Sequence, residues 1–423
     1  MLKNLSTWVL LALVFGLGVG AYVQANPEPW LEEAGKIVEA VGALWLNLLR
    51  MTVVPLVFAI LVTGIASAAD AAASGRLALR AVLLFTVLIF GAAIYATVTA
   101  QAMLAFWPVD REAAAAFVAG VKQPDLAAMT PPGLAEWIKN LAPSNVIDAA
   151  ANDRILPLVV FASFFGFALT RVEPRLRASL APMLEAIAET MIKVVHWVLL
   201  AAPVGVFALS FGVGAHAGIV AAGVLAQYVV VVSGCIIGII IVGYALAVLL
   251  ARVPLATFAR AMAPTTAVAF STQSSLASLP AMLDSARALG VPERVRNMIL
   301  PLAVAVFRFT SPVGNLAVVY FVCHLYGIEP TLAQMIAGVF VAFAASVAAV
   351  GLPGTTSFIV SIAPIALAVG APIEILGVLI AVEVIPDIFR TIGNVTGDVM
   401  ATKALARSET GGAAAQPNSA AAR

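Results

Sequence analysis

The sequence predicts an all-α polytopic membrane protein with about eight transmembrane helices and two re-entrant helical hairpins. Of its 423 residues, 62% are hydrophobic and only 11% are charged. The mean hydropathy of +1.05 lies outside the range of soluble domains of this length. Apolar stretches long enough to cross a bilayer recur along the chain, and two further apolar segments are interrupted by glycine, proline and clustered hydroxyl residues.

The expected spans follow from the thickness of the hydrocarbon, which a helix of about 20 apolar residues crosses. The N-terminal apolar stretch, residues 6–24, follows a basic start and ends in small residues, as a signal peptide does. It is long enough to span, and the chain after it is also apolar, so it is interpreted as a retained first helix. The predicted spans are residues 6–24, 41–67, 81–106, 153–172, 182–212, 217–250, 297–325 and 374–404.

The two hairpins are predicted over residues 257–287, interrupted by "STQSSLASLP", and residues 331–370, interrupted by "VGLPGTTS". A broken helix cannot face lipid, because its freed backbone groups need protein or water as partners. Both segments are therefore expected to enter and leave the membrane on the same side. Two such segments in one chain are typical of secondary transporters, which bind their substrate near the bilayer midplane.

The basic residues indicate the orientation, since they fall on one side of the predicted topology. The positive-inside rule makes that side, with both termini, cytoplasmic, in a bacterial inner (plasma) membrane. Residues 108–152 then form an extracytoplasmic loop with helical pieces, and residues 408–423 a disordered tail. A net charge of +1 excludes nucleic acid as a partner and leaves the lipid bilayer and small molecules.

A polar stripe runs along the last predicted span. At 100° per residue its five members, Glu383, Asp387, Arg390, Asn394 and Asp398, share an arc of about 80°. Such groups are costly inside a membrane and normally face a site or a partner. The stripe could bind a small zwitterion that carries an extra negative charge. The alternative interpretation is that its residues form internal ion pairs that only hold helices together.

Within this stripe Arg390 offers a planar fork to a carboxylate, and Asp387 can accept an ammonium group. In the first hairpin, Ser274 and Ser275 add hydroxyls and a helix N-terminus suited to an α-carboxylate. The alternative interpretation is that these serines only supply hydrogen bonds to the free backbone groups at the helix break. Arg308 is the unexpected residue, because it places a permanent charge within the apolar run 299–323.

An enzyme is not expected. The chain shows no nucleophile beside a base, no metal-ligand spacing and no nucleotide loop. Both cysteines lie in apolar runs, where a thiol behaves as a buried hydrophobe, and the three histidines are far apart. No cofactor is predicted.

Several motifs occur in an order that resembles the glutamate transporter family, the dicarboxylate/amino acid:cation symporters. They are "MTVVPLVFAILVTGIASA", "LAPSNVIDAAANDRILPLVVFASFFGFAL", "AFSTQSSLASLP", "GLPG" and "RTIGNVTGD". The resemblance implies a homotrimer in which a mobile transport domain carries substrate past a scaffold by an elevator motion. The scaffold would comprise residues 1–80 and 107–216, and the transport domain residues 81–106 and 217–407.

The resemblance also implies roles for individual residues. Arg390 would bind the substrate's side-chain carboxylate, Asp387 its amino group and Asn394 its main-chain end. Because Asp387 is present, acidic amino acids such as aspartate and glutamate are favoured over dicarboxylates. The implied substrate-binding set is Ser274, Ser275, Ser311, Gly351, Pro353, Gly354, Asp387, Arg390, Thr391 and Asn394, with the Gly351–Gly354 segment forming the tip of an outer gate.

The chain departs from the family where relatives bind sodium. Their Asn-Met-Asp-Gly-Thr motif, at a break in the seventh helix, falls here on Phe307, Arg308, Phe309, Thr310 and Ser311. Other sodium positions become Phe85, Leu88, Ile89 and Ala349, whereas Ser346 and Asp398 remain. A hard cation needs about six oxygen ligands, which phenylalanine and leucine cannot supply.

Arg308 is therefore expected to replace the sodium and to neutralise Asp398 or Glu383. The alternatives are that it only packs beside a carboxylate or binds substrate directly. A covalently attached cation cannot be released on the far side, so it cannot couple transport to a sodium gradient. We therefore predict sodium-independent transport, which is either coupled to H⁺ or proceeds by exchange or uniport. Two alternative hypotheses remain. The first is a sodium symporter whose Na⁺ sites use other ligands near Ser346, and the second is an amino-acid sensor or anion channel.

Overall fold

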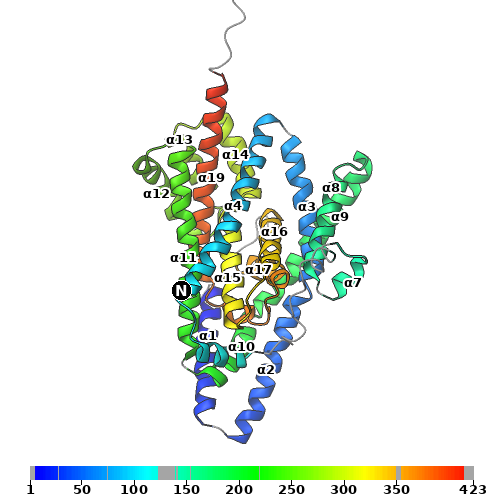
Figure 1. Cartoon of the computed structure of the whole chain (residues 1–423), viewed down its shortest axis with the longest axis vertical. Helices are drawn as coiled ribbons and strands as arrows, with labels where there is room; N and C mark the ends of the chain where they lie inside the picture. Colours follow the sequence, from blue (N-terminus) through cyan, green and yellow to red (C-terminus); the bar gives the residue numbers. More distant parts are fainter. Residues whose placement is uncertain are drawn as a thin grey trace, which may run out of the picture.

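The structure is a computed structural model that describes residues 5–26, 28–73, 75–121, 139, 142–152, 154–218, 220–348 and 354–413. Every regular element in these ranges is a helix, and the long apolar ones confirm the predicted all-α polytopic membrane fold. Figure 1 shows an elongated bundle whose long helices run roughly along the vertical axis.

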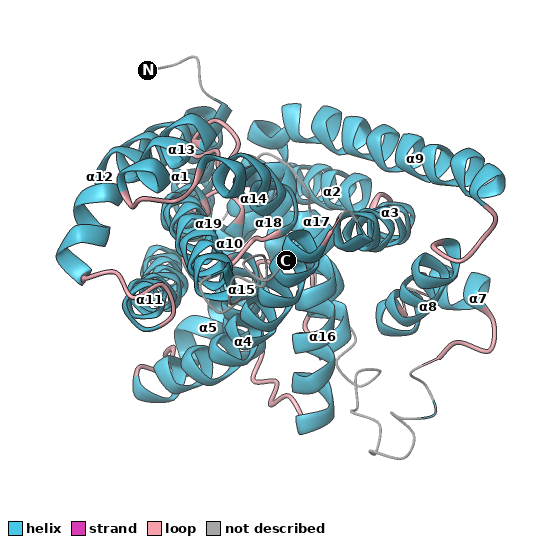
Figure 2. Cartoon of the chain, turned by 90° about the horizontal axis from the view of Figure 1, so that it is seen from above, coloured by secondary structure: helices cyan, strands magenta, loops and turns pink. Residues whose placement is uncertain are grey.

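The first half of the chain supplies nine of the described helices. They are α1 (Leu5–Ala25), α2 (Pro29–Arg50), α3 (Val53–Ala73), α4 (Arg76–Phe106), α5 (Arg111–Ala119), α7 (Val146–Ala151), α8 (Ile155–Leu169), α9 (Pro174–Leu200) and α10 (Ala202–Ala217). Helix α1 packs along α10, and α3 packs between α8 and α9. Figures 1 and 2 both place α7, α8 and α9 on one side of the molecule, away from α11.

The second half contains α11 (Val220–Leu249), α12 (Leu255–Thr272), α13 (Leu279–Ala288), α14 (Glu293–Val306), α15 (Ser311–Leu325), α16 (Leu332–Ala348), α17 (Gly354–Val369), α18 (Leu376–Leu379) and α19 (Val384–Ala413). Helices α12 and α13 contact each other, as do α16 and α17. The predicted hairpin segments 257–287 and 331–370 correspond to the helix pairs α12–α13 and α16–α17. Helix α19 contacts α11, α12, α13, α14 and α15, so it is the central element of this half.

Several predicted spans need correction. The stretch 182–212 is not one straight helix, because α9 and α10 meet at an angle of 61°. Pro203 explains the bend, since a proline disfavours helical backbone in the residue before it and removes a helix hydrogen bond. The stretch 153–172 contains only the 15-residue helix α8, about 22 Å long. The span beginning at 41 belongs to a helical run from Pro29 to Asp70.

The last predicted span also differs. Residues 374–404 are divided into α18 and α19 by a turn, and α19 continues to Ala413. The helix thus enters the segment predicted as a disordered tail, of which residues 414–423 lie outside the described ranges. In the loop 108–152, the described helical pieces are α5 and α7. Side chains cap both helices: Asp110 accepts two hydrogen bonds from the backbone of α5, and Asn145 accepts two from that of α7.

The break between α14 and α15 is packed tightly against α19. A Cβ added to Gly393 would stand 2.2 Å from Cγ2 of Thr310 and 2.9 Å from Cγ1 of Ile240. We therefore expect Gly393→Ala to force the break away from α19 and to cost about 1–3 kcal/mol of stability, seen as a lower thermal unfolding temperature in detergent. Gly223→Ala is the matched control, because nothing lies within 4 Å of its added Cβ. Equal unfolding temperatures for the two variants would contradict this packing argument.

Candidate functional site

The predicted polar stripe forms a buried cluster at the centre of the second half. Asp387, Arg390, Asn394 and Asp398 lie on α19, and Glu383 lies in the turn that precedes it. None of the five is more than 8% exposed. A group of charges this deeply buried is stable only if its members compensate one another or bind a ligand.

Arg390 is held by two carboxylates of the stripe. Its Nη2 donates to Oε1 of Glu383 at 2.6 Å, and its Nη1 donates to Oδ1 of Asp387 at 3.4 Å. Its Nε has no hydrogen-bond partner among the described residues. The sequence predicts that the Arg390 guanidinium binds substrate. In the structure it is hydrogen-bonded to Glu383 and Asp387, so a substrate carboxylate would have to compete with these two side chains.

Tyr228 is a site residue that sequence reasoning does not single out. It lies on α11, is fully buried, and donates a 2.6 Å hydrogen bond to Oε2 of Glu383. Its ring packs edge-on against Phe321, with centroids 5.3 Å apart. The available signal is a tyrosine within the apolar helix α11, since a buried hydroxyl needs a polar partner.

The helix break at 307–310 holds Asn394 in place. The backbone N–H of Thr310 donates to Oδ1 of Asn394 at 2.9 Å. The Thr310 hydroxyl donates to the carbonyl oxygen of Arg390 at 2.6 Å and also lies 2.9 Å from Oδ1 of Asn394. Ser311 is buried and begins α15. These bonds use the carbonyl oxygen of the Asn394 side chain and do not involve its amide nitrogen.

Arg308 lies in this break, half-buried, on the side of the α19 carboxylates. It interacts electrostatically with Asp387 and Asp398. Asp398 is 1% exposed, and neither of its carboxylate oxygens has a hydrogen-bond partner among the described residues. The charged group that acts on Asp398 is Arg308, whereas Glu383 is compensated by Arg390.

Aromatic rings occupy the remainder of the break. Phe307 stacks on Phe85 of α4, with ring centroids 4.5 Å apart and ring planes at 11°. The ring centroid of Phe309 lies 5.8 Å from that of Phe307. Ile89 is buried nearby in the same core cluster. Phe309 also fills the space beside Gly397, where an added Cβ would lie 2.9 Å from Cβ of Phe309 and 3.0 Å from Cδ1 of its ring. Apolar packing thus replaces oxygen ligands at the positions where the resemblance implies sodium sites.

The remaining predicted residues are placed less centrally. Ser274 and Ser275 are half-buried at the turn between α12 and α13, where the backbone N–H of Ala277 donates to Oγ of Ser274. Thr391 donates to the carbonyl oxygen of Asp387 and Ser346 to that of Ala342. Gly354 begins α17. Gly351, Pro353 and Ala349 lie outside the described residues, so the tip of the second hairpin is not placed.

Known proteins resemble this chain over nearly its whole length. A sequence model described as the sodium:dicarboxylate symporter family matches residues 5–408. The chain belongs to this family. Its members are transporters rather than enzymes, as the sequence predicts.

Three relatives align over nearly the whole chain. A proton/glutamate-aspartate symporter of Escherichia coli is 29% identical and covers 96% of this chain and 93% of its own. A proton/sodium-glutamate symport protein of Bacillus subtilis is 26% identical, with the same coverage. A C4-dicarboxylate transport protein of Bacillus subtilis is 25% identical and covers 96% and 94%. The relatives thus differ in coupling ion and in substrate.

Proposed function

We propose that this family member transports acidic amino acids or C4-dicarboxylates across a bacterial inner membrane, independently of sodium and coupled to protons. The observation that carries the proposal is Arg308 beside Asp398, in a break lined by Phe85, Phe307 and Phe309. A guanidinium supplies the positive charge that a bound sodium would supply, but it is tethered and cannot be released on the far side.

The charges of the site support protons as the coupling ion. Three buried carboxylates, Glu383, Asp387 and Asp398, face two guanidiniums, those of Arg308 and Arg390. One negative charge is left over, and an anionic substrate brings another. Burying that excess is costly unless a carboxylate takes up a proton. Glu383 is the favoured acceptor, since it shares the single guanidinium of Arg390 with Asp387, whereas Asp398 has the guanidinium of Arg308.

The substrate class follows from Arg390 and Asp387. The planar guanidinium binds carboxylates well, and its Nε is available to one. Asp387 can hold an ammonium group, which favours amino acids over simple dicarboxylates. The names of the Escherichia coli and Bacillus subtilis relatives include both substrate classes.

A homotrimer and an elevator motion complete the proposal. Residues 81–106 and 217–407 would form the moving domain, and residues 1–80 and 107–216 the scaffold, with both termini in the cytoplasm. The resemblance supports this division. So does the separation of α7, α8 and α9 from α11, α15 and α19 in both views of the molecule (Figures 1 and 2).

Uptake of radiolabelled aspartate into proteoliposomes of the purified protein is the direct test. We expect equal uptake with sodium, potassium or choline outside, and faster uptake when the outside is acidic relative to the inside. Competition by unlabelled glutamate and succinate then ranks the substrate classes. Uptake that appears only with sodium would refute the proposal and favour rebuilt sodium sites. Uptake that ignores the pH gradient but needs internal substrate would refute proton coupling and identify an exchanger.

A further inference from the structure

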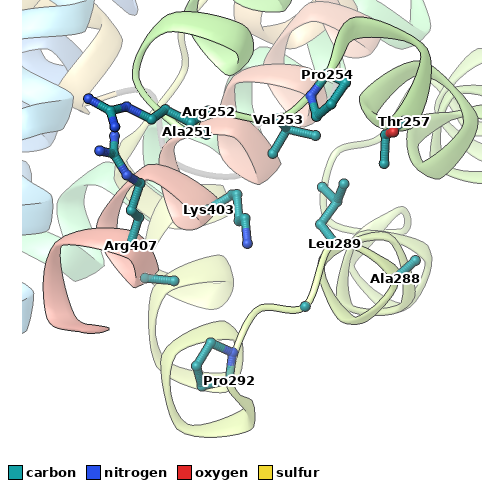
Figure 3. A pocket seen from close by; sticks show the side chains of 12 residues that line it. Ala251, Arg252, Val253, Pro254, Thr257, Ala288, Leu289, Pro292, Lys403 and Arg407 are labelled. Atoms are coloured by element: carbon teal, nitrogen blue, oxygen red, sulfur yellow. The ribbon is translucent and has the colours of Figure 1, made fainter. Parts of the chain in front are cut away.

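A basic cavity of about 470 Å³ lies at the end of the molecule where α11 ends, α13 joins α14, and α19 emerges from the bundle. Figure 3 shows it from close by, with its lining drawn from these three places. Lys403 follows Asp398, the last residue of the polar stripe, by five residues on α19, ~7.5 Å along the helix axis, and follows Arg390 by thirteen residues, ~20 Å. The cavity lies beyond the end of the stripe, and none of the five stripe residues lines it.

The lining carries one sign of charge. Arg252, Lys403 and Arg407 are its charged members, and none of the described residues that line it is acidic. In Figure 3 the guanidinium groups of Arg252 and Arg407 point toward one another, and the ammonium group of Lys403 points into the open space. Nη1 of Arg407 donates to the carbonyl oxygen of Leu250 at 3.1 Å, which fixes this side chain at the rim. Like charges converging on one concavity repel each other and attract an anion.

Backbone groups add to this field. Helix α12 follows Pro254 and helix α14 follows Pro292, both prolines line the cavity, and neither helix start has a side-chain cap. The first N–H groups of a helix lack intrahelical partners and favour negative charge. Glu293, just outside the lining, is already paired with Arg296 at 3.9 Å. Two helix starts without side-chain caps and three basic residues thus contribute to the lining of this cavity.

The volume of the cavity and its position in the molecule indicate which class of ligand it could bind. The volume is that of a small-molecule site and exceeds what a bare inorganic ion fills. Ala251, Val253 and Leu289 provide an apolar wall beside the charges. The positive-inside rule puts this end in the cytoplasm, where basic pockets of membrane proteins meet anionic headgroups and soluble anions. A phosphate with two negative charges matches the two cations of Arg252 and Lys403 better than a single carboxylate does.

We infer that this cavity binds a phosphate group, carried by a phospholipid headgroup or a soluble phosphorylated molecule, at a site distinct from the transport site. A bound phosphate would join the α11–α12 connection, the α13–α14 connection and the end of α19. The ligand would thereby stabilise the cytoplasmic end of the first hairpin against α19.

Thermal unfolding of the full-length protein in detergent tests the inference. One arm adds inorganic phosphate against sodium chloride at equal ionic strength. The other adds phosphatidylglycerol against phosphatidylcholine, with retained lipid counted by native mass spectrometry. We expect a rise in unfolding temperature in at least one arm, and a loss of at least tenfold in apparent affinity for Lys403→Gln and for Arg252→Gln. Arg260→Gln is the matched control, since Arg260 is exposed at the same end of the molecule and outside the cavity.

Each outcome has a defined meaning. A response to phosphate alone supports a soluble ligand, a response to phosphatidylglycerol alone supports a lipid headgroup, and a response to both supports the shared phosphate chemistry. No response in either arm overturns the inference. An equal loss in the Arg260→Gln control also overturns it, because the effect would then be general surface charge. Lys403→Gln keeps the test usable if Arg252→Gln, whose backbone has a positive φ of 51°, unfolds.

Discussion

Replacing Arg308 by methionine is expected to reduce substrate uptake at least tenfold. Methionine retains much of the side-chain volume and removes the charge. Asp398 would then be a buried carboxylate without a compensating cation, since its oxygens have no hydrogen-bond partner among the described residues. Removing one member of a buried charge pair costs ~3–5 kcal/mol. Initial uptake rates in proteoliposomes, normalised to the reconstituted protein, measure the effect.

Three companion variants separate the charge of Arg308 from its packing. Arg308→Lys keeps the charge and should retain most of the uptake. Asp398→Asn, combined with Arg308→Met, removes both charges and should recover part of the lost activity, because no uncompensated carboxylate is then buried. In Arg308→Met alone, acidic pH or sodium is expected to restore substrate binding by neutralising Asp398. Unchanged uptake in Arg308→Met, without sodium, would show that the guanidinium does not replace a cation.

The polar stripe could be predicted from the sequence because it depends mainly on local geometry. Asp387, Arg390, Asn394 and Asp398 belong to one regular helix, so their spacing alone places them on one face. The break beside Arg308 is implied by the family resemblance alone, since the residues themselves predict one continuous span over 297–325.

The pairing within the site depends on contacts between distant segments and could not be predicted. Tyr228 reaches Glu383 from 155 positions away, and Thr310 fixes Asn394 from 84 positions away. Periodicity says nothing about such partners. It also does not show that the Arg390 fork is engaged by Glu383, which lies in a turn rather than on the regular helix.

Replacing Arg390 by glutamine is expected to abolish measurable uptake of acidic substrates. The change removes the group proposed to bind the substrate carboxylate and leaves Glu383 and Asp387 buried without their cation. Truncating a buried, hydrogen-bonded charge pair costs at least ~2 kcal/mol, equivalent to about a thirtyfold loss of affinity. Binding of aspartate to the purified protein, followed by calorimetry, and uptake in proteoliposomes should both show the loss.

Tyr228→Phe provides a graded comparison for Arg390→Gln, because it removes only the hydroxyl that donates to Glu383 and keeps the ring packed on Phe321. The lost hydrogen bond to a charged group should cost ~1.5–3 kcal/mol, less than the loss of the whole guanidinium. Arg390→Lys should fall between them, since a lysine keeps the charge but cannot hold two carboxylates with one planar fork. If Arg390→Gln binds aspartate as tightly as Tyr228→Phe does, Arg390 serves only to neutralise Glu383 and Asp387, and the substrate carboxylate must bind elsewhere.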